Sequence, residues 1–322
     1  MKAPFIALVT VLLVSPSFAS PQVADAKSEL AAAIAILKAH HINRDKIDWP
    51  TVTVRAESLI RRPEEASSAY GGIYFVISQL GERHTRLVTA DQAKSNSSGV
   101  QVGNAAPPRV TPPQGYALAD GIGLIEERFM VGPRAQELSY AEAARAALMN
   151  FTAARICRFI IDLRNNTGGN MYPMIAGVSA LLGSEPYGYF EEPGEPERVW
   201  NSLKSVGLED QRNPAFPSWL SLAPVAVLID GDTGSSGEFT AMAFKGRVHT
   251  RFFGEDTAGF VTANSTYSLP DGAILVVTSA FAKDRNRTLY RKALTPDKAT
   301  PRGQLTLDAA VVWLKQQQCP VP

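Results

Sequence analysis

Two adjacent serines, Ser235 and Ser236, lie in the stretch LIDGDTGSSGEFTAM, residues 228–242. The residues before them form an apolar run typical of a buried strand, and those after them a helical pattern. A helix N-terminus offers unpaired N–H groups and a positive dipole end, which together stabilise an oxyanion. Gly234 and Gly237 let the backbone turn sharply and approach a substrate. The pattern is compatible with a nucleophilic serine at position 236, but the local residues taken alone favour a simple helix N-cap.

A second stretch, IIDLRNNTGGNMYPM at residues 160–174, has the same order of buried strand, Gly-Gly turn and helix. Two strand ends that both open into glycine-rich helix N-termini can meet at one crevice of an α/β sheet. Gly168 and Gly169 would then present N–H groups to Ser236. An ordinary tight turn is the alternative interpretation of this Gly-Gly pair.

A nucleophilic serine needs a base, and the sequence has four histidines. His40 and His41 close a helical pattern, where a cation suits the negative dipole end, and His249 lies in a strand pattern. His84 lies in QLGERHTRL, flanked by charged residues, and on its own fits an exposed helix end. An imidazole with an ordinary pKa of about 6.5 can accept a proton at neutral pH.

Short apolar strands alternate with helical stretches over residues 117–322, which predicts a layered α/β core with largely buried strands. Residues 20–93 have a helical pattern and are expected to form a small N-terminal domain that carries His84. Residues 94–116 are rich in Ser, Gly, Asn and Pro, as in a linker or exposed loop. In the core we expect strands at 117–130 (or a hairpin), 158–166, 225–231, 248–254 and 266–282, and helices at 139–154, 171–183, 235–246 and 305–317.

The first 19 residues have the pattern of a secretory signal peptide. Lys2 precedes an apolar run over residues 5–14, and Ser17 and Ala19 provide small residues before a cut near position 20. The run is too short to span a hydrocarbon core of about 30 Å, and no later segment is long and apolar enough. We therefore expect a periplasmic or secreted protein whose mature chain has no membrane span.

The composition excludes several functional classes. Without Lys2 the 32 Lys and Arg fall to 31, equal to the 31 Asp and Glu, so nucleic acid or anionic membranes are not expected partners. No Cys/His cluster has metal-ligand spacing and no phosphate-binding loop is present, so no metal and no cofactor is expected. Cys157 and Cys319 could pair in an oxidising compartment, although Cys157 also fits a buried free thiol.

Four segments occur in an order and approximate spacing that resemble the tail-specific (C-terminal processing) and tricorn-type serine peptidase family. The layout also resembles the nisin-resistance branch of that family, through KIDWPTV, ISQLGERHTRL and GGNMYPMIAGVSALLG. This resemblance implies a ClpP/crotonase-like core with a small N-terminal helical domain, and no PDZ-like segment is evident after His84. The four segments are IIDLRNNTGG, VAVLIDGDTGSSGE, GEDTAG (254–259) and LTPD (294–297).

The resemblance implies that Ser236 is the nucleophile and that Gly237 and the Gly168–Gly169 turn form the oxyanion hole. Processing proteases carry a lysine base after GE-x-T-x-G, where this chain has Phe260, and neither Val261 nor Thr262 can replace it. Tricorn-like and nisin-resistance members take a histidine from L-G-x-x-H-T, which His84 and Thr85 match. The nisin-resistance branch also implies Asn170 and Met171 as substrate contacts.

A third, orienting carboxylate is not assigned, because Arg83 and Tyr290 replace the serine and the glutamate of tricorn-type enzymes. Glu238, Glu255 and Asp284 are the candidates. The sequence thus predicts an exported serine peptidase that acts on a peptide or protein. A non-catalytic peptide-binding member of the same fold is the alternative, and an esterase-like hydrolase is a weaker one. The sequence does not address the oligomeric state.

Overall fold

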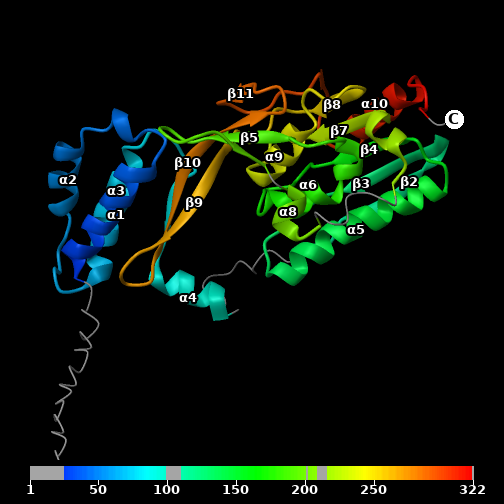
Figure 1. Ribbon diagram of the computed structural model, residues 1–322. Helices are drawn as coiled ribbons and strands as arrows, with labels where there is room; N and C mark the ends of the chain where they lie inside the picture. Colours follow the sequence, from blue (N-terminus) through cyan, green and yellow to red (C-terminus); the bar gives the residue numbers. More distant parts are fainter. Residues whose placement is uncertain (1–24, 99–109, 201, 209–215, 321–322) are drawn as a thin grey trace, which may run out of the picture.

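The computed structural model describes residues 25–98, 110–200, 202–208 and 216–320. A helical unit lies at one end of the molecule and an α/β body at the other, and a long hairpin of β9 and β10 runs between them (Figure 1). The expected signal peptide at 1–19 and residues 99–109 of the expected linker lie outside the described residues.

One six-stranded sheet forms the centre of the body, in the order β12-β8-β7-β4-β3-β2. All its neighbouring strands are parallel except the antiparallel pair β2–β3, so the hairpin expected at 117–130 is confirmed. The strands are β2 (Gln114–Leu118), β3 (Ile122–Glu126), β4 (Arg158–Asp162), β7 (Val225–Ile229), β8 (Thr250–Gly254) and β12 (Lys298–Ala299).

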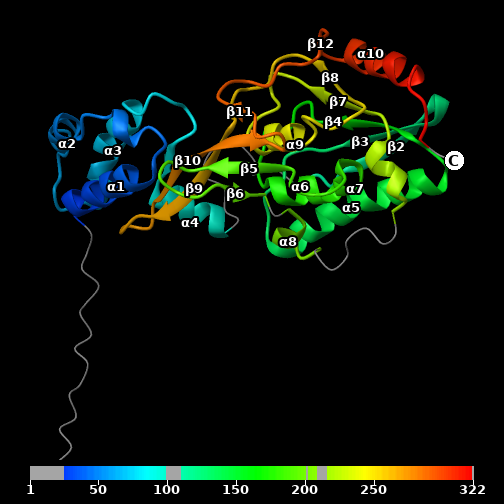
Figure 2. The same ribbon diagram turned by 45° about the horizontal axis from the view of Figure 1, so that its top comes forward.

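Successive residues of these strands face opposite helical layers. Ile160, Ala226 and Leu228 pack against the closing helix α10, whereas Ile161 and Val227 face the layer that contains α5, α6 and α9. Figure 2 shows α10 and α5 on opposite sides of the sheet. The predicted layered α/β core is therefore confirmed. The helices of the body are α5 (Arg134–Ala153), α6 (Met171–Gly177), α7 (Ser179–Leu182), α8 (Ser202–Val206), α9 (Ser236–Ala243) and α10 (Gln304–Lys315).

The second sheet is organised by one long strand, β10. Strand β9 pairs with most of its length, from Ile274 to Phe281, whereas β1 pairs with its beginning and β5 and β11 with its end. The sequence predicted the two strands of the β9–β10 hairpin but not their partners, because β1, β6 and β11 have only two or three residues and no detectable alternation. The strands are β1 (Arg86–Val88), β5 (Gly188–Glu191), β6 (Arg198–Val199), β9 (Thr262–Ser268), β10 (Ile274–Asp284) and β11 (Leu289–Tyr290).

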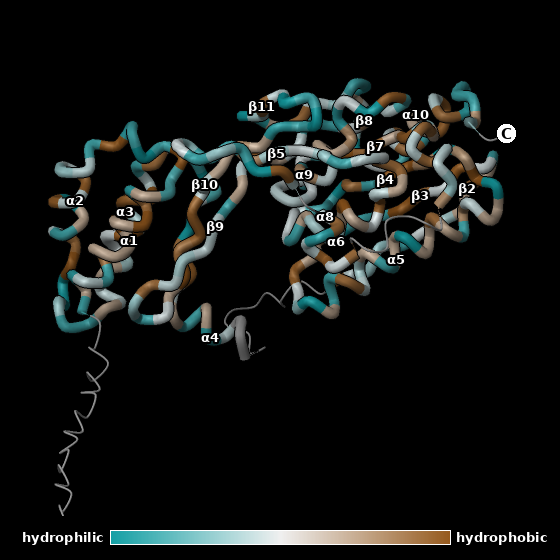
Figure 3. The backbone as a smooth tube through the Cα atoms, viewed as in Figure 1, coloured by the Kyte–Doolittle hydropathy of each residue, from teal (hydrophilic) through white to brown (hydrophobic). Residues whose placement is uncertain are grey.

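The helical unit shares its hydrophobic core with the far end of the hairpin. Leu30 and Ile73 belong to the same buried cluster as Leu269, Leu275 and Val277, so the helices are not an independent globule. Figure 3 shows the hydrophobic segments of α3 and β10 that contribute to this packing. The unit contains α1 (Ala26–His40), α2 (Trp49–Glu57), α3 (Tyr70–Ser78) and α4 (Ala90–Ser98). Among the described residues, the short 3-10 helices are η1 (Arg44–Lys46), η2 (Ala66–Ala69), η3 (Ala119–Gly121) and η5 (Ser218–Leu222).

Both ends of the linker expected at 94–116 belong to regular elements in the structure. Helix α4 continues through its first five residues to Ser98, and β2 begins at Gln114. The helix starts with a capping box, in which the Thr89 N–H donates to Gln92 Oε1 (3.0 Å) and the Gln92 N–H to Thr89 Oγ1 (3.4 Å). The composition of the segment did not reveal the capping box, because the residues after it are mostly poor helix formers.

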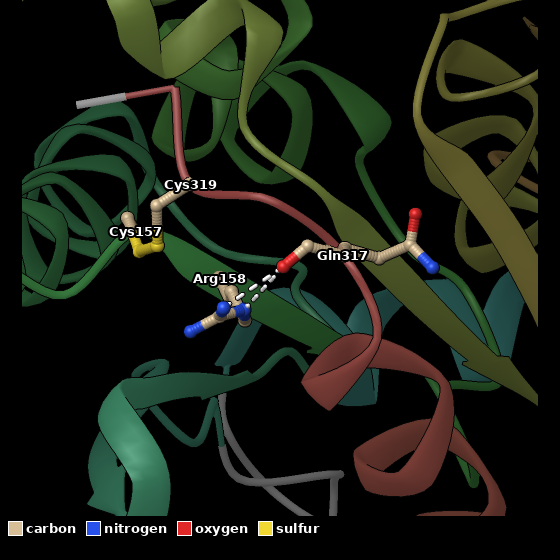
Figure 4. The surroundings of a disulfide bond; sticks show 4 residues. All are labelled: Cys157, Arg158, Gln317 and Cys319. Atoms are coloured by element: carbon tan, nitrogen blue, oxygen red, sulfur yellow. Dashed lines mark hydrogen bonds between the residues drawn. A yellow bond between two sulfur atoms is a disulfide. The ribbon is translucent and has the colours of Figure 1, made fainter. Parts of the chain in front are cut away.

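Cys157 and Cys319 form a disulfide, with their Cα atoms 5.5 Å apart. The bond joins the segment after α10 to the residue just before β4 (Figure 4). Beside it, the Nε and Nη2 atoms of Arg158 donate to the carbonyl oxygen of Gln317 at 3.0 and 2.8 Å. The free-thiol alternative for Cys157 is therefore not what the structure shows. Separately, none of the described helices combines the length and the apolar character that crossing a bilayer requires.

Candidate active site

Ser236 is the first residue of α9, directly after the glycine-rich turn that follows β7. Ser235 before it has φ +50°, a left-handed conformation that few side-chain-bearing residues adopt. Asp230 braces this turn, since its Oδ1 atom accepts the N–H groups of Asp232 and Thr233, each at 3.0 Å. The conformation of Ser235 and the hydrogen bonds of Asp230 place the Ser236 hydroxyl at the end of the strand. Only 5% of Ser236 is exposed there.

The two glycine-rich turns meet, as the sequence predicted. The Gly234 N–H donates to the Asn166 carbonyl oxygen at 2.9 Å. A Cβ atom on Gly168 would lie 2.9 Å from the Ser235 Cβ atom, and one on Gly237 would lie 2.5 Å from the Asn166 carbonyl oxygen. Side chains at these glycines would therefore push the turns apart.

The Ser236 hydroxyl donates to the carbonyl oxygen of Gly169 at 2.6 Å. Of the expected oxyanion donors, the Gly237 N–H donates to the Gly234 carbonyl at 2.9 Å, and the Gly168 N–H to Asn166 Oδ1 at 3.1 Å. The N–H groups of Gly169 and Ser236 have no hydrogen-bond partner within the described residues. In this conformation, free donors at the site therefore come from Gly169 and from Ser236 itself.

His84 lies in the loop between α3 and β1 and is half-buried. Its Nδ1 atom is 3.1 Å from Thr262 Oγ1, and its ring packs against Phe260 with the centroids 5.1 Å apart. His84 and Ser236 line the same cavity of about 720 Å³. They form no hydrogen bond with each other in the described structure, in which the Ser236 hydroxyl is bonded to Gly169 and the Nδ1 atom of His84 to Thr262.

The His84 loop is held by Glu82. Its carboxylate accepts the N–H groups of His84 and Thr85, and its Oε1 atom lies 3.2 Å from His41 Nε2. Burial would raise the pKa of Glu82, but the hydrogen bonds from His41, Thr85 and the backbone lower that pKa to about 2. Glu82 therefore stays ionised and fixes the loop, and His41 has a structural partner rather than a place in the cavity.

Burial lowers the pKa of His84 to about 4, a shift that the Arg86 charge reinforces and the Glu82 charge partly opposes. The imidazole is therefore neutral at pH 7. A neutral imidazole has one nitrogen lone pair, which can accept a proton from a hydroxyl group.

Glu238 is the expected orienting candidate that lies nearest in sequence to Ser236, and it is fully buried. It accepts the N–H groups of Ser235 at 3.0 Å and Gly259 at 2.9 Å, and the hydroxyl group of Thr257. Burial raises the pKa of Glu238, and these hydrogen bonds oppose the shift. Its carboxylate thus ties the serine turn to the 257–260 loop and does not contact His84.

The other two candidates also lie away from the histidine. Glu255 pairs with Arg302 at 2.6 Å, and Asp284 accepts the N–H groups of Asn286 and Thr288 at 2.8 and 2.9 Å. Within the described residues, the side chain that hydrogen-bonds the His84 ring is Thr262. The sequence analysis considered Thr262 only as a replacement for lysine, and no local signal marks it as a partner of a residue on another element.

Asn170 and Met171 line the cavity at the start of α6. Asn170 Oδ1 accepts the Tyr172 N–H at 3.0 Å and Asn170 Nδ2 donates to Glu137 Oε1 at 2.6 Å, so this side chain caps the helix. Met171 is 5% exposed and packs partly in the core. Both residues therefore expose only a small part of their surface to a ligand in the cavity. Among the described residues, no group of three or more His, Cys, Asp or Glu could hold a metal ion.

Comparisons with known proteins identify the family of the chain. Residues 128–300 match the model of peptidase family S41, a range that contains Ser236 but not His84. Over 167 residues the chain is 37% identical to the nisin-resistance protein of Lactococcus lactis subsp. lactis, covering 49% of this chain and 50% of the relative. It is 28% identical to a carboxyl-terminal-processing protease of Picosynechococcus sp., covering 45% of this chain and 32% of that protein. The match thus spans half or less of each relative.

Solved structures share the fold over most of the chain. A lipoprotein from Streptococcus agalactiae superposes with a TM-score of 0.75 at 22% identity, covering 95% of this chain and 99% of that one. A photosystem II D1 C-terminal processing protease superposes with a TM-score of 0.60 at 12% identity, covering 90% and 97%. In the described part of the chain, α4, β2 and η3 are the regular elements between β1 and β3, and no PDZ-like domain lies among them.

Proposed function

Because this chain belongs to peptidase family S41, we propose that it is an exported serine-type peptidase whose catalytic pair is Ser236 and His84. The observation that carries the proposal is that both side chains line one cavity, although they lie on elements 152 positions apart. The expected signal peptide at residues 1–19 supports export to the periplasm or the medium.

In the proposed reaction, Ser236 Oγ attacks the carbonyl carbon of a peptide bond while His84 accepts the hydroxyl proton. His84 then delivers that proton to the leaving amine, and water hydrolyses the acyl-enzyme in the same way. The N–H groups of Gly169 and Gly237 would stabilise the oxyanion. The Gly168 N–H would position the turn through Asn166, to which it is already bonded.

The reaction requires two of the hydrogen bonds described above to change. Ser236 Oγ must exchange the Gly169 carbonyl for a nitrogen of His84, and Gly237 must share its N–H between Gly234 and the oxyanion. Hydrogen bonds between catalytic groups are often long or absent without substrate and form in the complex. A peptide in the cavity would displace the serine hydroxyl from the Gly169 carbonyl. The oxyanion formed from that peptide would then accept hydrogen bonds from the N–H groups of Gly169 and Gly237.

Peptides or proteins are the proposed substrates, with no metal or organic cofactor. The name of the 37% identical relative makes nisin a first peptide to assay. Asn170 and Met171 would contact the substrate at the N-terminus of α6, beside the Gly168–Gly169 turn.

The test is labelling of the purified protein by a fluorophosphonate, which reacts covalently with an activated serine. We expect labelling of the wild type, none of Ser236→Ala, and strongly slowed labelling of His84→Ala. Ser235→Ala is the matched control, because it removes the neighbouring hydroxyl and leaves the proposed nucleophile. Labelling that persists in Ser236→Ala would exclude Ser236 as the nucleophile.

The second candidate is a non-catalytic peptide-binding protein of the same fold. It is favoured by the bond from Ser236 to Gly169 and by the lack, in the described residues, of a carboxylate on the His84 ring. Under this alternative the wild type binds peptides, is not labelled, and releases no product. A direct comparison of binding and cleavage for one peptide panel separates the two candidates.

A further inference from the structure

The cavity that holds Ser236 and His84 carries an unbalanced positive charge. Arg83, Arg86 and Arg198 line it, and its lining, all of it within the described residues, contains neither Asp nor Glu. The whole chain has a formal net charge of only +1, with 32 basic and 31 acidic residues. The excess of positive charge is therefore a local property of this cavity.

Two of the three guanidinium groups have no carboxylate partner. In the described structure no Asp or Glu oxygen lies within 4.0 Å of a nitrogen of Arg83 or Arg86. Glu82, next to Arg83 in sequence, is already engaged by His41 and the backbone. Arg198 differs, because it pairs with Glu192.

Arg86 belongs to the sheet that forms part of the cavity wall. It pairs with Val276 of β10, and Val276 pairs in turn with Thr266 of β9. Directly paired residues of antiparallel strands project from the same face of a sheet, and all three residues line the cavity. Arg86 thus lies two residues after His84, on a row of paired strand residues that lines the same cavity.

Arg83 flanks His84 on the other side in sequence, with its Cζ atom 5.6 Å from the centroid of the Phe260 ring. The Phe260 ring also packs against the imidazole of His84. A guanidinium over an aromatic face keeps its donors free for a planar acceptor such as a carboxylate. Part of the cavity lining is apolar or aromatic and suits the stems of peptide side chains, namely Phe129, Val131, Met171, Tyr172, Phe190 and Phe239.

We propose that Arg83 and Arg86 form a subsite for the carboxylate of an acidic side chain of the substrate, so that the enzyme selects peptides with Asp or Glu close to the scissile bond. This inference rests on the proposed function and specifies its substrate class. Arginine pairs with carboxylates through two parallel hydrogen bonds, which adds specificity to the charge attraction. Acidic side chains are excluded from most partly buried sites unless such a partner is available.

The test compares peptides that differ only by Glu or Gln at one position, moved through three residues on each side of the cleaved bond. Each peptide is made with a free and with an amidated C-terminus. We expect the wild type to prefer Glu over Gln at one position by about tenfold in kcat/KM, in both C-terminal forms. The preference should weaken in high salt, since the arginines are solvent-exposed.

The variant for the test is Arg83→Gln with Arg86→Gln, and its readout is the Glu/Gln ratio rather than the rate, because Arg86 also influences His84. We expect the ratio to fall to about one. Arg55→Gln, which removes the same charge from the exposed face of α2, should keep the wild-type ratio. A wild type without a Glu preference, a preference that depends only on the free C-terminus, or a ratio unchanged in the double variant would overturn the proposal.

Binding measurements separate this proposal from the catalytic one. In Ser236→Ala, fluorescence anisotropy of labelled Glu and Gln peptides reports recognition without cleavage. If no peptide is cleaved by the wild type, the proposed function fails. The proposed arginine subsite is then supported if Ser236→Ala binds the Glu peptide about tenfold more tightly than the Gln peptide. It is contradicted if the two affinities are equal.

Discussion

The Nδ1 atom of His84 lies 3.1 Å from the Oγ1 atom of Thr262, which belongs to strand β9, 178 positions further along the chain. A histidine that acts as a base needs one fixed ring orientation and one fixed tautomer. If Nδ1 carries the proton and donates to the Thr262 hydroxyl, Nε2 keeps its lone pair for a serine. Thr262 would thus do with a neutral hydroxyl what an acidic residue does in a catalytic triad.

We expect Thr262→Val to lower kcat by about 10- to 100-fold with a smaller change in KM, because the ring loses its partner while the shape of the side chain is kept. Thr262→Ser keeps a hydroxyl and should retain most of the activity. Steady-state kinetics of the two variants on one cleaved peptide provide the comparison. A fully active Thr262→Val would show that the hydroxyl does not orient the histidine.

The lowered pKa of His84 predicts an unusual pH profile. A base is functional while it is unprotonated, so kcat/KM should be flat from about pH 6 to 8 and fall on acidification with a midpoint near pH 4. Because Arg86 adds to this depression, Arg86→Gln should move the midpoint upwards. The measurement is kcat/KM on a peptide without titratable side chains, so that only the enzyme is titrated. A midpoint near the ordinary value of about 6.5 would contradict the expected lowering of the His84 pKa.

Much of this site could be predicted from short segments of the sequence. The stretches around Gly168 and Ser236 each show an apolar strand, a glycine turn and a helix within about fifteen residues, and parallel strands bring such turns to one edge. The glycines are required by close backbone contacts that a Cβ atom would prevent. Local patterns of this kind are visible because sequence neighbours are also structural neighbours.

The partners of these groups could not be predicted in the same way. Thr262 lies on β9 and Glu82 shortly before β1, and the pairing of both strands with β10 brings the two segments together, although β1 has only three residues and no pattern of its own. The occupied N–H of Gly237 is also invisible in the sequence, because it depends on the backbone path of the turn. Long-range register and individual hydrogen bonds are properties of packing, so the histidine could be identified but not its orientation.

The disulfide predicts a strong effect of reduction on stability. Cys157 and Cys319 are 162 positions apart, and closing a loop of that size removes entropy from the unfolded chain equivalent to about 5 kcal/mol in the chain-entropy model. We expect reduction to lower the free energy of unfolding by about 2–5 kcal/mol, as measured by urea denaturation with and without dithiothreitol. Cys157→Ala combined with Cys319→Ala should resemble the reduced protein and show no further response to the reductant. A reductant effect that persists in this double variant would have another origin.

The contact between the helical unit and the hairpin turn predicts a second pH dependence. Glu29 of α1 is fully buried, and its Oε2 atom accepts the Asp271 N–H at 3.2 Å, while Tyr70 donates its hydroxyl to Asp271 Oδ2 at 2.5 Å. Burial, together with the nearby Asp271 charge, raises the pKa of Glu29 to about 7 from its ordinary 4.5. In the folded protein Glu29 therefore holds a proton between about pH 4.5 and 7 that it releases in the unfolded chain.

Because the folded state binds the extra proton, the contribution of Glu29 to stability is complete below about pH 4.5 and is lost as the pH rises through 7. We expect the free energy of unfolding to fall by about 1–3 kcal/mol between pH 5 and 8, and Glu29→Gln to remove most of this slope. Glu57→Gln, on the exposed surface of α2, is the matched control and should keep the slope. Since Glu29 joins α1 to the β9–β10 turn, hydrogen exchange should show this loss first in α1 and the hairpin end. A slope unchanged in Glu29→Gln would place the titrating group elsewhere.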